Sequence, residues 1–261
     1  MLKRISIPLA LISLGAAQGA LAAEEGRWTA AFQLGTSLVP HGSFQARETA
    51  SIANLGSVIP SLAGKAGTLD LERQNFDDIF RAGPSFGLEL GYQATAKLEP
   101  FARLSYTQFR GRTTRIGDIQ SAALAKPADI RAEFDDLESW TADFGARYYF
   151  IDTGRTRPYL GGYVGVERAS ELHAHVRVDG TLTPPKRVEL LPKETRFDAG
   201  VEVGLAYEIA SRTALRFGVG ADYNSPRHQT SHAYQSLGAA PMRVTDQSWS
   251  FPIDLGLTFQ F

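Results

Sequence analysis

The chain ends in Phe251-Pro252-Ile253-Asp254-Leu255-Gly256-Leu257-Thr258-Phe259-Gln260-Phe261. Every odd position of this stretch is large and apolar, and every even position is small or polar. Such alternation predicts a β-strand with two unlike faces, because successive side chains of a strand point to opposite sides. The apolar face either packs on a core or faces lipid, and the rest of the chain decides between the two.

The same alternation recurs upstream. The segments that show it are 27–35, 85–92, 101–107, 140–150, 159–167, 197–207 and 214–223. In 159–167 glycine occupies both faces, so the phase of that segment is the least defined. With the terminal segment, the pattern predicts eight strands.

The connections between these strands alternate in length. The long connections are 37–81, 111–136, 169–195 and 224–247, and the short ones lie near 93–98, 152–156 and 209–212. Bacterial outer-membrane barrels have even strand numbers, short periplasmic turns and longer external loops. We therefore predict an all-β fold: an eight-stranded antiparallel transmembrane β-barrel with four long extracellular loops, three short periplasmic turns and both termini in the periplasm. A hairpin-turn signal at Asp179-Gly180 predicts that the fifth and sixth strands extend beyond the membrane.

The charges of the predicted strands provide an independent test of the lipid-facing side. A charge at the middle of a bilayer costs about 2–4 kcal/mol for Arg or Lys. A soluble barrel would instead place its apolar residues inside. All the charges fall on the face opposite the apolar set: Glu89, Arg103, Asp143, Arg147, Glu167, Asp198, Glu202, Glu208, Arg216, Asp222 and Asp254.

Aromatic residues gather at the predicted strand ends, as in membrane-interface girdles. We expect a periplasmic girdle of Trp28, Tyr92, Tyr148, Phe150, Tyr207 and Phe259. We expect an outer girdle of Tyr106, Trp140, Phe197, Tyr223, Trp249 and Phe251.

The N-terminus predicts a secretory signal peptide over residues 1–22, which leaves 23–261 as the barrel. Lys3 and Arg4 precede an apolar run, which ends in small residues at 20–23. No later window of about 20 apolar residues predicts a spanning helix. Cysteine is absent, and a closed barrel satisfies its backbone groups without disulfides. The net charge of −1 excludes the basic balance of a nucleic-acid-binding protein.

Two motifs make the chain resemble a known group. These are the terminal Leu255-x-Leu257-x-Phe259-x-Phe261 and the segment Pro158-Tyr159-Leu160-Gly161-Gly162-Tyr163-Val164-Gly165. From about Arg27 onward, the chain is similar to the small eight-stranded outer-membrane barrels of the OmpA-like and opacity-protein type. The resemblance implies that Leu255, Leu257, Phe259 and Phe261 form the signal recognised by the barrel-assembly machinery. Because the chain stops at Phe261, we expect no peptidoglycan-binding domain.

Side chains nearly fill the interior of an eight-stranded barrel, so its charges must be paired. The predicted lumen network is Glu89, Arg103, Asp143, Arg147, Glu202, Arg216 and Asp254. Reflection about the short turns places Glu89 near Arg103, Glu202 diagonal to Arg216 and Glu208 beside Arg212. Two interpretations stay open: a plug of ion pairs, and a narrow channel in which the excess of acids favours cations.

The histidines offer catalytic and metal-binding hypotheses. His41-Gly42-Ser43 is the only His-x-Ser triplet, a pair that some small barrels use with an acid on outer-leaflet lipid, but no acid partner is evident. His173 with His175, and His228 with His232, have spacings that could bind a metal. No Cys or close acid supports this, so we expect solvated loop histidines, no cofactor and no enzyme activity.

Three functions remain, in order of preference. The first is a structural or cell-surface interaction role through the loops 37–81, 111–136, 169–195 and 224–247, where binding usually resides on a rigid scaffold. The first loop also carries an apolar patch: Ile52, Leu55, Val58, Ile59 and Leu62. The second function is a small passive diffusion channel, and the third is an enzyme acting on outer-leaflet lipid. Expected partners are outer-membrane lipid and lipopolysaccharide, the assembly machinery and an extracellular protein or surface ligand, with no nucleic acid and a monomeric state.

Overall fold

The computed structural model describes residues 25–39, 42–57, 59–181, 184–225, 227–231, 242–246 and 249–261. The proposed signal peptide, residues 1–22, lies outside this part of the chain, and so do His41, Val58 and His232. Within it, none of the helices has the length and apolar character needed to cross a membrane.

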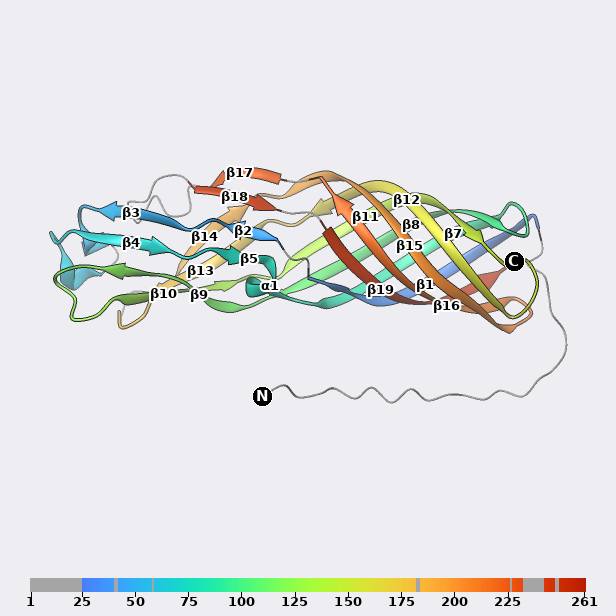
Figure 1. Cartoon of the computed structure of the whole chain (residues 1–261), viewed down its shortest axis with the longest axis horizontal. Coiled ribbons are helices and arrows are strands. Elements are labelled where there is room, and N and C mark those ends of the chain that lie inside the picture. The colour runs from blue at the N-terminus through green and yellow to red at the C-terminus, as the bar shows by residue number, and fades with distance from the viewer. Residues whose placement is uncertain are drawn as a thin grey trace.

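Eight antiparallel strands close into a barrel, which confirms the predicted fold class (Figure 1). Each alternating segment of the sequence forms one strand, usually longer by a few residues than the pattern predicts. The strands are β1 (Arg27–Leu38), β7 (Gly83–Gln93), β8 (Leu98–Gly111), β11 (Leu137–Tyr149), β12 (Thr156–Ala169), β15 (Glu194–Ala210), β16 (Thr213–Asn224) and β19 (Trp249–Gln260).

The terminal strand closes the sheet. β19 pairs with β16 on one side and with β1 on the other, over the register from Thr29–Gln260 to Leu38–Phe251. The last residue takes part in the seam, because the Phe261 N–H donates to the Trp28 carbonyl at 2.9 Å. Both sheet edges are thereby removed, so no strand of the barrel is left with a row of unpaired backbone groups.

The outer surface of the barrel is apolar. Leu88 is 62% exposed, Phe144 66% and Leu255 53%, whereas Glu89, Asp143 and Arg147 on these strands are buried inside the barrel. Cross-strand aromatic pairs flank this apolar belt: Trp28 packs on Tyr92 near one end, and Tyr106 on Trp140 and Tyr223 on Trp249 near the other. The orientation predicted for every strand, including the glycine-rich 159–167, is thus confirmed.

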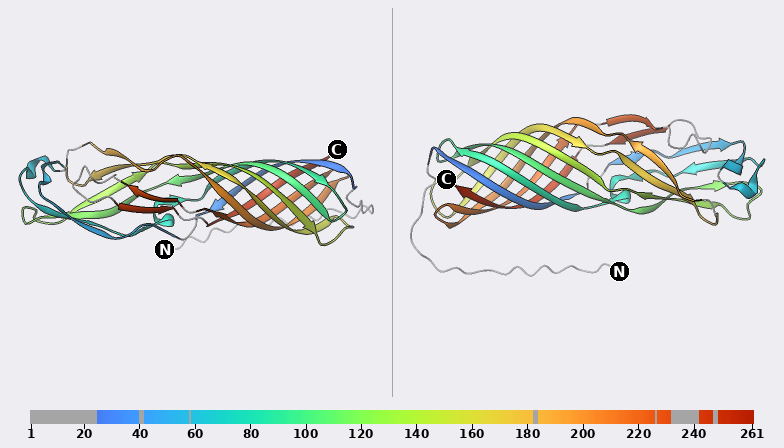
Figure 2. Two further views of the ribbon diagram at one scale, coloured as in Figure 1. Left: turned by 90° about the horizontal axis from the view of Figure 1, so that it is seen from above. Right: turned by 180° about the vertical axis from the view of Figure 1, so that it is seen from behind.

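The connections at one end of the barrel hold much more structure than the sequence pattern predicts. They form two additional sheets beyond the barrel, which Figures 1 and 2 show as a continuation of its long axis. One sheet has the order β14 (Lys186–Leu191), β13 (Leu172–Val178), β10 (Ala128–Phe134), β9 (Thr113–Gln120), β4 (Gly67–Leu71) and β3 (Glu48–Ile52). The other has the order β17 (Arg227–Ser231), β18 (Met242–Asp246), β2 (Ser43–Gln45) and β5 (Gln74–Asn75).

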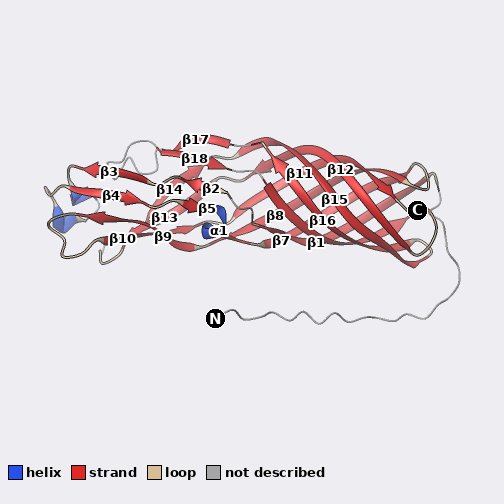
Figure 3. Cartoon of the chain, viewed as in Figure 1, coloured by secondary structure: helices blue, strands red, loops and turns tan. Residues whose placement is uncertain are grey.

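Short helices and one further strand complete this region, which we call the extension. The helices are α1 (Phe76–Ile79) and the single 3-10 turns η1 (Leu55–Ser57) and η2 (Pro60–Leu62), and they are the only blue segments in Figure 3. The strand β6 (Phe80–Arg81) pairs with the end of β8. The short turns and the C-terminus lie at the opposite end of the barrel, which we call the turn end (Figure 1).

The extension has its own hydrophobic core. Its apolar residues lie inside and its charged residues outside, whereas the barrel has the reverse arrangement. Leu55, Leu69, Ile119 and Leu172 are fully buried there, and the rings of Phe44 and Phe76 meet edge to face at 5.4 Å. The apolar patch predicted in the first connection contributes Ile52, Leu55 and Ile59 to this core. The long connections predicted from the sequence therefore form sheets here, because their apolar residues recur at period two and bury one face of each sheet.

Candidate functional site

A network of buried ion pairs crosses the middle of the barrel. The Arg147 guanidinium is 1% exposed; its Nη1 and Nη2 donate to the two carboxylate oxygens of Glu89 at 2.6 and 2.5 Å, and its Nε donates to Glu202. Arg216 Nη2 donates to Glu89 at 2.6 Å. Arg103 donates one hydrogen bond from Nε to Asp143 at 3.2 Å and another from Nη1 to Glu202 at 3.0 Å. Each guanidinium is thus held by one or two carboxylates in a region that excludes solvent.

Aromatic rings fill the space between these charges. The Arg147 guanidinium lies 4.0 Å from the centroid of the Phe101 ring, and the Arg103 guanidinium lies 4.2 Å from that of Tyr163. Such contacts stabilise a desolvated guanidinium further. We call the following group the plug: Glu89, Glu99, Arg103, Arg147, Glu202 and Arg216, with Phe101, Tyr149 and Tyr159.

The lower part of the plug is built around Glu99. Its carboxylate accepts hydrogen bonds from the Tyr149 hydroxyl at 2.5 Å and the Thr29 hydroxyl at 2.7 Å. Arg157 lies with its guanidinium 3.9 Å from the centroid of the Tyr149 ring. Sequence reasoning missed Glu99 and Arg157, although both continue the inward-facing alternation by one step beyond the predicted strand starts at Phe101 and Tyr159.

The structure places all seven predicted lumen residues inside the barrel but pairs them differently from the sequence expectation. Glu89 and Arg103 do face each other in the β7–β8 register, yet the Glu89 carboxylate binds Arg147 and Arg216 instead. Glu202 binds Arg103 and Arg147 rather than Arg216. Long side chains reach across the narrow lumen to strands that are not neighbours in the sheet. The sequence expectation compared only strands joined by a short turn, so it did not include these pairs.

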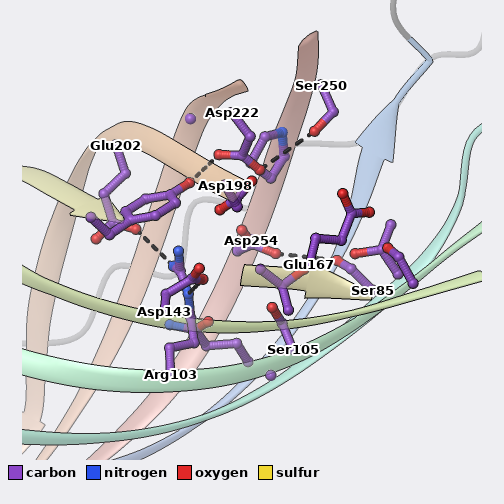
Figure 4. Close-up of a pocket in the computed structure, with 18 of the residues that line it drawn as sticks. Ser85, Arg103, Ser105, Asp143, Glu167, Asp198, Glu202, Asp222, Ser250 and Asp254 are labelled. Carbon is purple, nitrogen blue, oxygen red and sulfur yellow. Dashed lines mark hydrogen bonds and ion pairs between the residues drawn. The ribbon is translucent and has the colours of Figure 1, made fainter. Parts of the chain in front are cut away.

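The plug separates two cavities. A chamber on the extension side is lined by side chains from all eight strands, among them Arg103, Asp143 and Glu202 (Figure 4). A smaller cavity at the turn end is lined by Glu99, Tyr149 and other residues. Arg216 borders both cavities. Neither of these cavities in the described part of the chain runs the length of the barrel.

Inward-facing glycines make room for the aromatic rings of the plug. Tyr159 faces Gly204 across the β12–β15 pair, and Tyr163 faces Gly200. A Cβ atom added at Gly204 would lie 2.5 Å from the Tyr159 hydroxyl oxygen and closer still to a backbone carbonyl. At Gly162, on the lipid-facing side, the nearest atom would be 3.9 Å away.

We therefore expect Gly204→Ala to lower the free energy of unfolding by about 1–3 kcal/mol, the usual cost of overpacking. Gly162→Ala makes the same chemical change on the same pair of strands and should alter stability by less than about 0.5 kcal/mol. Urea unfolding of both variants in phospholipid vesicles measures the difference. Equal stability of the two variants would contradict the tight packing of Tyr159 on Gly204.

The described histidines lie beside other polar side chains but do not form a metal site. His173 Nδ1 lies 3.2 Å from an Arg187 nitrogen, and His175 Nε2 lies 3.8 Å from an Asp135 oxygen. Among the described residues, no three His, Cys, Asp or Glu side chains are grouped to hold a metal ion. The His41-Gly42-Ser43 triplet cannot be placed, because His41 lies outside the described residues.

The outer face of the six-stranded sheet carries a lattice of exposed charges. Arg115 contacts the carboxylates of Glu72, Asp118 and Asp129, and its hydrogen bonds with Asp129 and Glu72 raise its pKa. Nearby, a hydrogen bond from the Arg47 guanidinium holds the pKa of the Asp70 carboxyl below its usual range. Basic and acidic side chains are thus interspersed on this face.

No protein-family model matches the chain, and no curated protein matches its sequence. Solved structures match at the level of the fold. Neisserial surface protein A is 16% identical, with 94% of this chain and 100% of that chain covered and a TM-score of 0.40. The outer membrane protein OprG from Pseudomonas aeruginosa is 12% identical, with 91% of this chain and 98% of that chain covered and a TM-score of 0.48. The outer membrane protease OmpT from Escherichia coli is 9% identical, with 94% of this chain and 99% of that chain covered and a TM-score of 0.37.

The apolar belt, the paired polar interior and the closed sheet are the features that decide the architecture, since in lipid every backbone group must be satisfied within the sheet. This chain is a closed antiparallel β-barrel with an apolar outer belt. Barrels of this architecture host unrelated functions, so the function must be argued from this chain's own interior and extension.

Proposed function

We propose that this protein is a cell-surface interaction protein whose extension points away from the cell and binds a partner there. The observation that carries the proposal is the extension itself. Its connections fold around a closed hydrophobic core and present a sheet with a charged outer face, rather than hanging as independent loops. A pre-organised surface of this kind reduces the entropy lost on binding.

The sidedness of the proposal rests on two features. The turns at the turn end are short, and the connections at the other end are long, as in bacterial barrels whose long loops lie outside the cell. The aromatic pairs at the two ends of the apolar belt mark the expected membrane boundaries. The extension would then stand clear of the outer leaflet, in reach of macromolecules.

The outer face of the extension indicates what kind of partner it would bind. Arg131 and Arg177 lie opposite each other in the register of β10 and β13, and both contact the Asp179 carboxylate. Arg187 on β14 lies opposite His175, is exposed on the same face and contacts Asp135. Three arginines thus lie near one edge of the face, so the partner would carry acidic groups that bind them.

Two measurements test this function. Protease treatment of intact cells should cleave the extension and leave the turn end intact. Retention of fluorescent cells on plates coated with laminin, fibronectin or heparin should rise with expression of the protein and fall in an Arg131→Ala, Arg177→Ala double variant. Lys97→Ala, at the turn end, serves as the matched control. A surface-exposed protein that increases retention on none of the three coatings would count against the proposal.

The two alternative functions have less support. A passive channel requires a continuous lumen, whereas the plug divides this one. An enzyme acting on outer-leaflet lipid requires an acid partner for His41 and Ser43, and no observation supplies one. Our prediction remains that the protein is not an enzyme.

We also propose that Leu255, Leu257, Phe259 and Phe261 direct assembly of the barrel into the outer membrane. Deletion of Phe261 should lower the amount of folded barrel in the outer membrane several-fold, because β19 must pair with β1 to close the sheet. Heat-dependent gel mobility of isolated outer membranes measures the folded fraction. Gln260→Ala, which keeps the final aromatic residue, is the control, and normal assembly of the truncated chain would refute the role of Phe261.

A further inference from the structure

The chamber between the plug and the extension is lined by polar side chains from the barrel strands and by apolar side chains near the extension. It holds about 1190 Å³ of space between atoms, counting the part that opens to solvent. Figure 4 shows labelled side chains from several strands pointing toward this space, most of them acidic. The acids that line it are Asp143, Glu167, Asp198, Glu202, Asp222 and Asp254.

The charges in this chamber do not balance. Three arginines line it, and each already contacts a carboxylate: Arg103 binds Asp143 and Glu202, Arg196 binds Glu167 at 2.5 Å, and Arg216 binds Glu89.

Three further carboxylates, those of Asp198, Asp222 and Asp254, form no ion pair with any Lys or Arg in the described part of the chain. Tyr163 and Ser250 donate hydrogen bonds to Asp222, and Ser85 donates one to Asp254, whereas Asp198 shares a hydrogen bond with the Asp143 carboxyl. The chamber therefore has more acidic than basic side chains.

A second observation points to a ligand that donates hydrogen bonds. Asn224 is 7% exposed and lines the chamber, and its Oδ1 atom has no hydrogen-bond partner. A buried acceptor left without a hydrogen bond is unfavourable. The unpaired Asn224 atom is an acceptor, so a molecule with N–H groups would satisfy it.

The wall nearer the extension is apolar. Phe76 and Phe80, from α1 and β6, line the chamber together with Phe109 and Leu137 at the ends of β8 and β11. An inorganic ion would gain nothing from these side chains, and no group of three suitable ligands is present among the described residues. An organic molecule with an apolar body would bury that body against them.

We infer that the chamber binds an organic cation, with its ammonium or guanidinium group on Asp198, Asp222, Asp254 and Asn224 and its apolar body against Phe76, Phe80 and Phe109. The acids attract the positive charge, the unpaired Asn224 oxygen accepts one of its N–H groups, and the aromatic wall selects against small inorganic cations. This binding is separate from the proposed surface interaction, which uses the outer face of the extension.

Titration calorimetry of the full-length protein in detergent micelles tests this inference. The probe is phenethylammonium, and its comparisons are the neutral 2-phenylethanol and the anionic phenylacetate. We expect saturable binding of the cation alone. Asp222→Asn and Asp198→Asn keep the shape of the side chain and should each weaken binding by about tenfold or more, the effect of losing one charge-assisted hydrogen bond. Asp152→Asn, at the turn end, should bind as the unaltered protein does.

Heat-dependent gel mobility verifies that each variant is folded before titration. Absence of saturable phenethylammonium binding would overturn the inference. Equal binding of 2-phenylethanol would also overturn it, since the chamber would then be an apolar pocket only. Unchanged affinity in both folded Asp→Asn variants would overturn the assignment to these carboxylates, and full competition by MgCl₂ at constant ionic strength would overturn the preference for an organic cation.

Discussion

Replacement of Arg147 by methionine should lower the free energy of unfolding by about 3–5 kcal/mol, the cost of breaking a buried ion pair from one side. Arg147 is the residue that joins Glu89 to Glu202 in the centre of the plug. Without it, Arg103 is the arginine left on Glu202, and Glu89 keeps Arg216 and a hydrogen bond from the Gln33 amide, so both carboxylates lose positive charge in a desolvated site. Urea unfolding in phospholipid vesicles, followed by tryptophan fluorescence, measures the loss.

The control for this variant is Arg131→Met in the extension. Arg131 also contacts a carboxylate, that of Asp179, but its side chain is 46% exposed. Exposed pairs of this kind contribute about 0–1 kcal/mol. A loss at Arg147 no larger than that at Arg131 would mean that the plug is hydrated and does not depend on its central guanidinium.

The same residue tests the channel hypothesis. In planar bilayers the unaltered protein should show no discrete openings, because the plug lies between the two cavities. Arg147→Ala removes the largest fully buried side chain among the described residues and should produce measurable conductance steps. Regular openings of the unaltered protein would restore the channel as the better proposal.

The second large effect is expected on the lipid-facing surface. Phe144 is 66% exposed in the middle of β11, and Phe150 is 55% exposed just beyond the end of the same strand. Arginine at the bilayer midplane costs about 2–4 kcal/mol, and this cost falls to about 0–1 kcal/mol near the interface. Phe144→Arg should therefore destabilise the barrel by about 2–4 kcal/mol, and Phe150→Arg by much less.

Urea unfolding in vesicles compares the two arginine variants directly, since both make the same substitution on one strand. The three tryptophans lie in or near the aromatic girdles, so their fluorescence reports insertion of each variant. Equal destabilisation at the two positions would show that the apolar belt is not centred on Phe144.

Period-two alternation was sufficient to predict the barrel. Each strand had to expose one apolar face and enclose one polar face, so the orientation of Phe144 or Glu89 followed from its place in the pattern. The extension was harder to predict. Segments such as Ala128–Phe134 and Leu172–Val178 also bury every second residue, but each has only 7 residues. So short an alternation does not show which core the buried face packs against.

The sequence by itself determined the number of strands, the lipid-facing side of each strand and the inward orientation of the charged residues within the predicted strands, because these depend only on local alternation. The tertiary structure alone decided which charges pair. Arg147 binds Glu89 and Glu202, and neither of these is its neighbour in the sheet register. Side chains that meet across a closed barrel come from strands far apart in the sequence, and the same closure leaves Asp198, Asp222 and Asp254 without a cationic partner in the described structure.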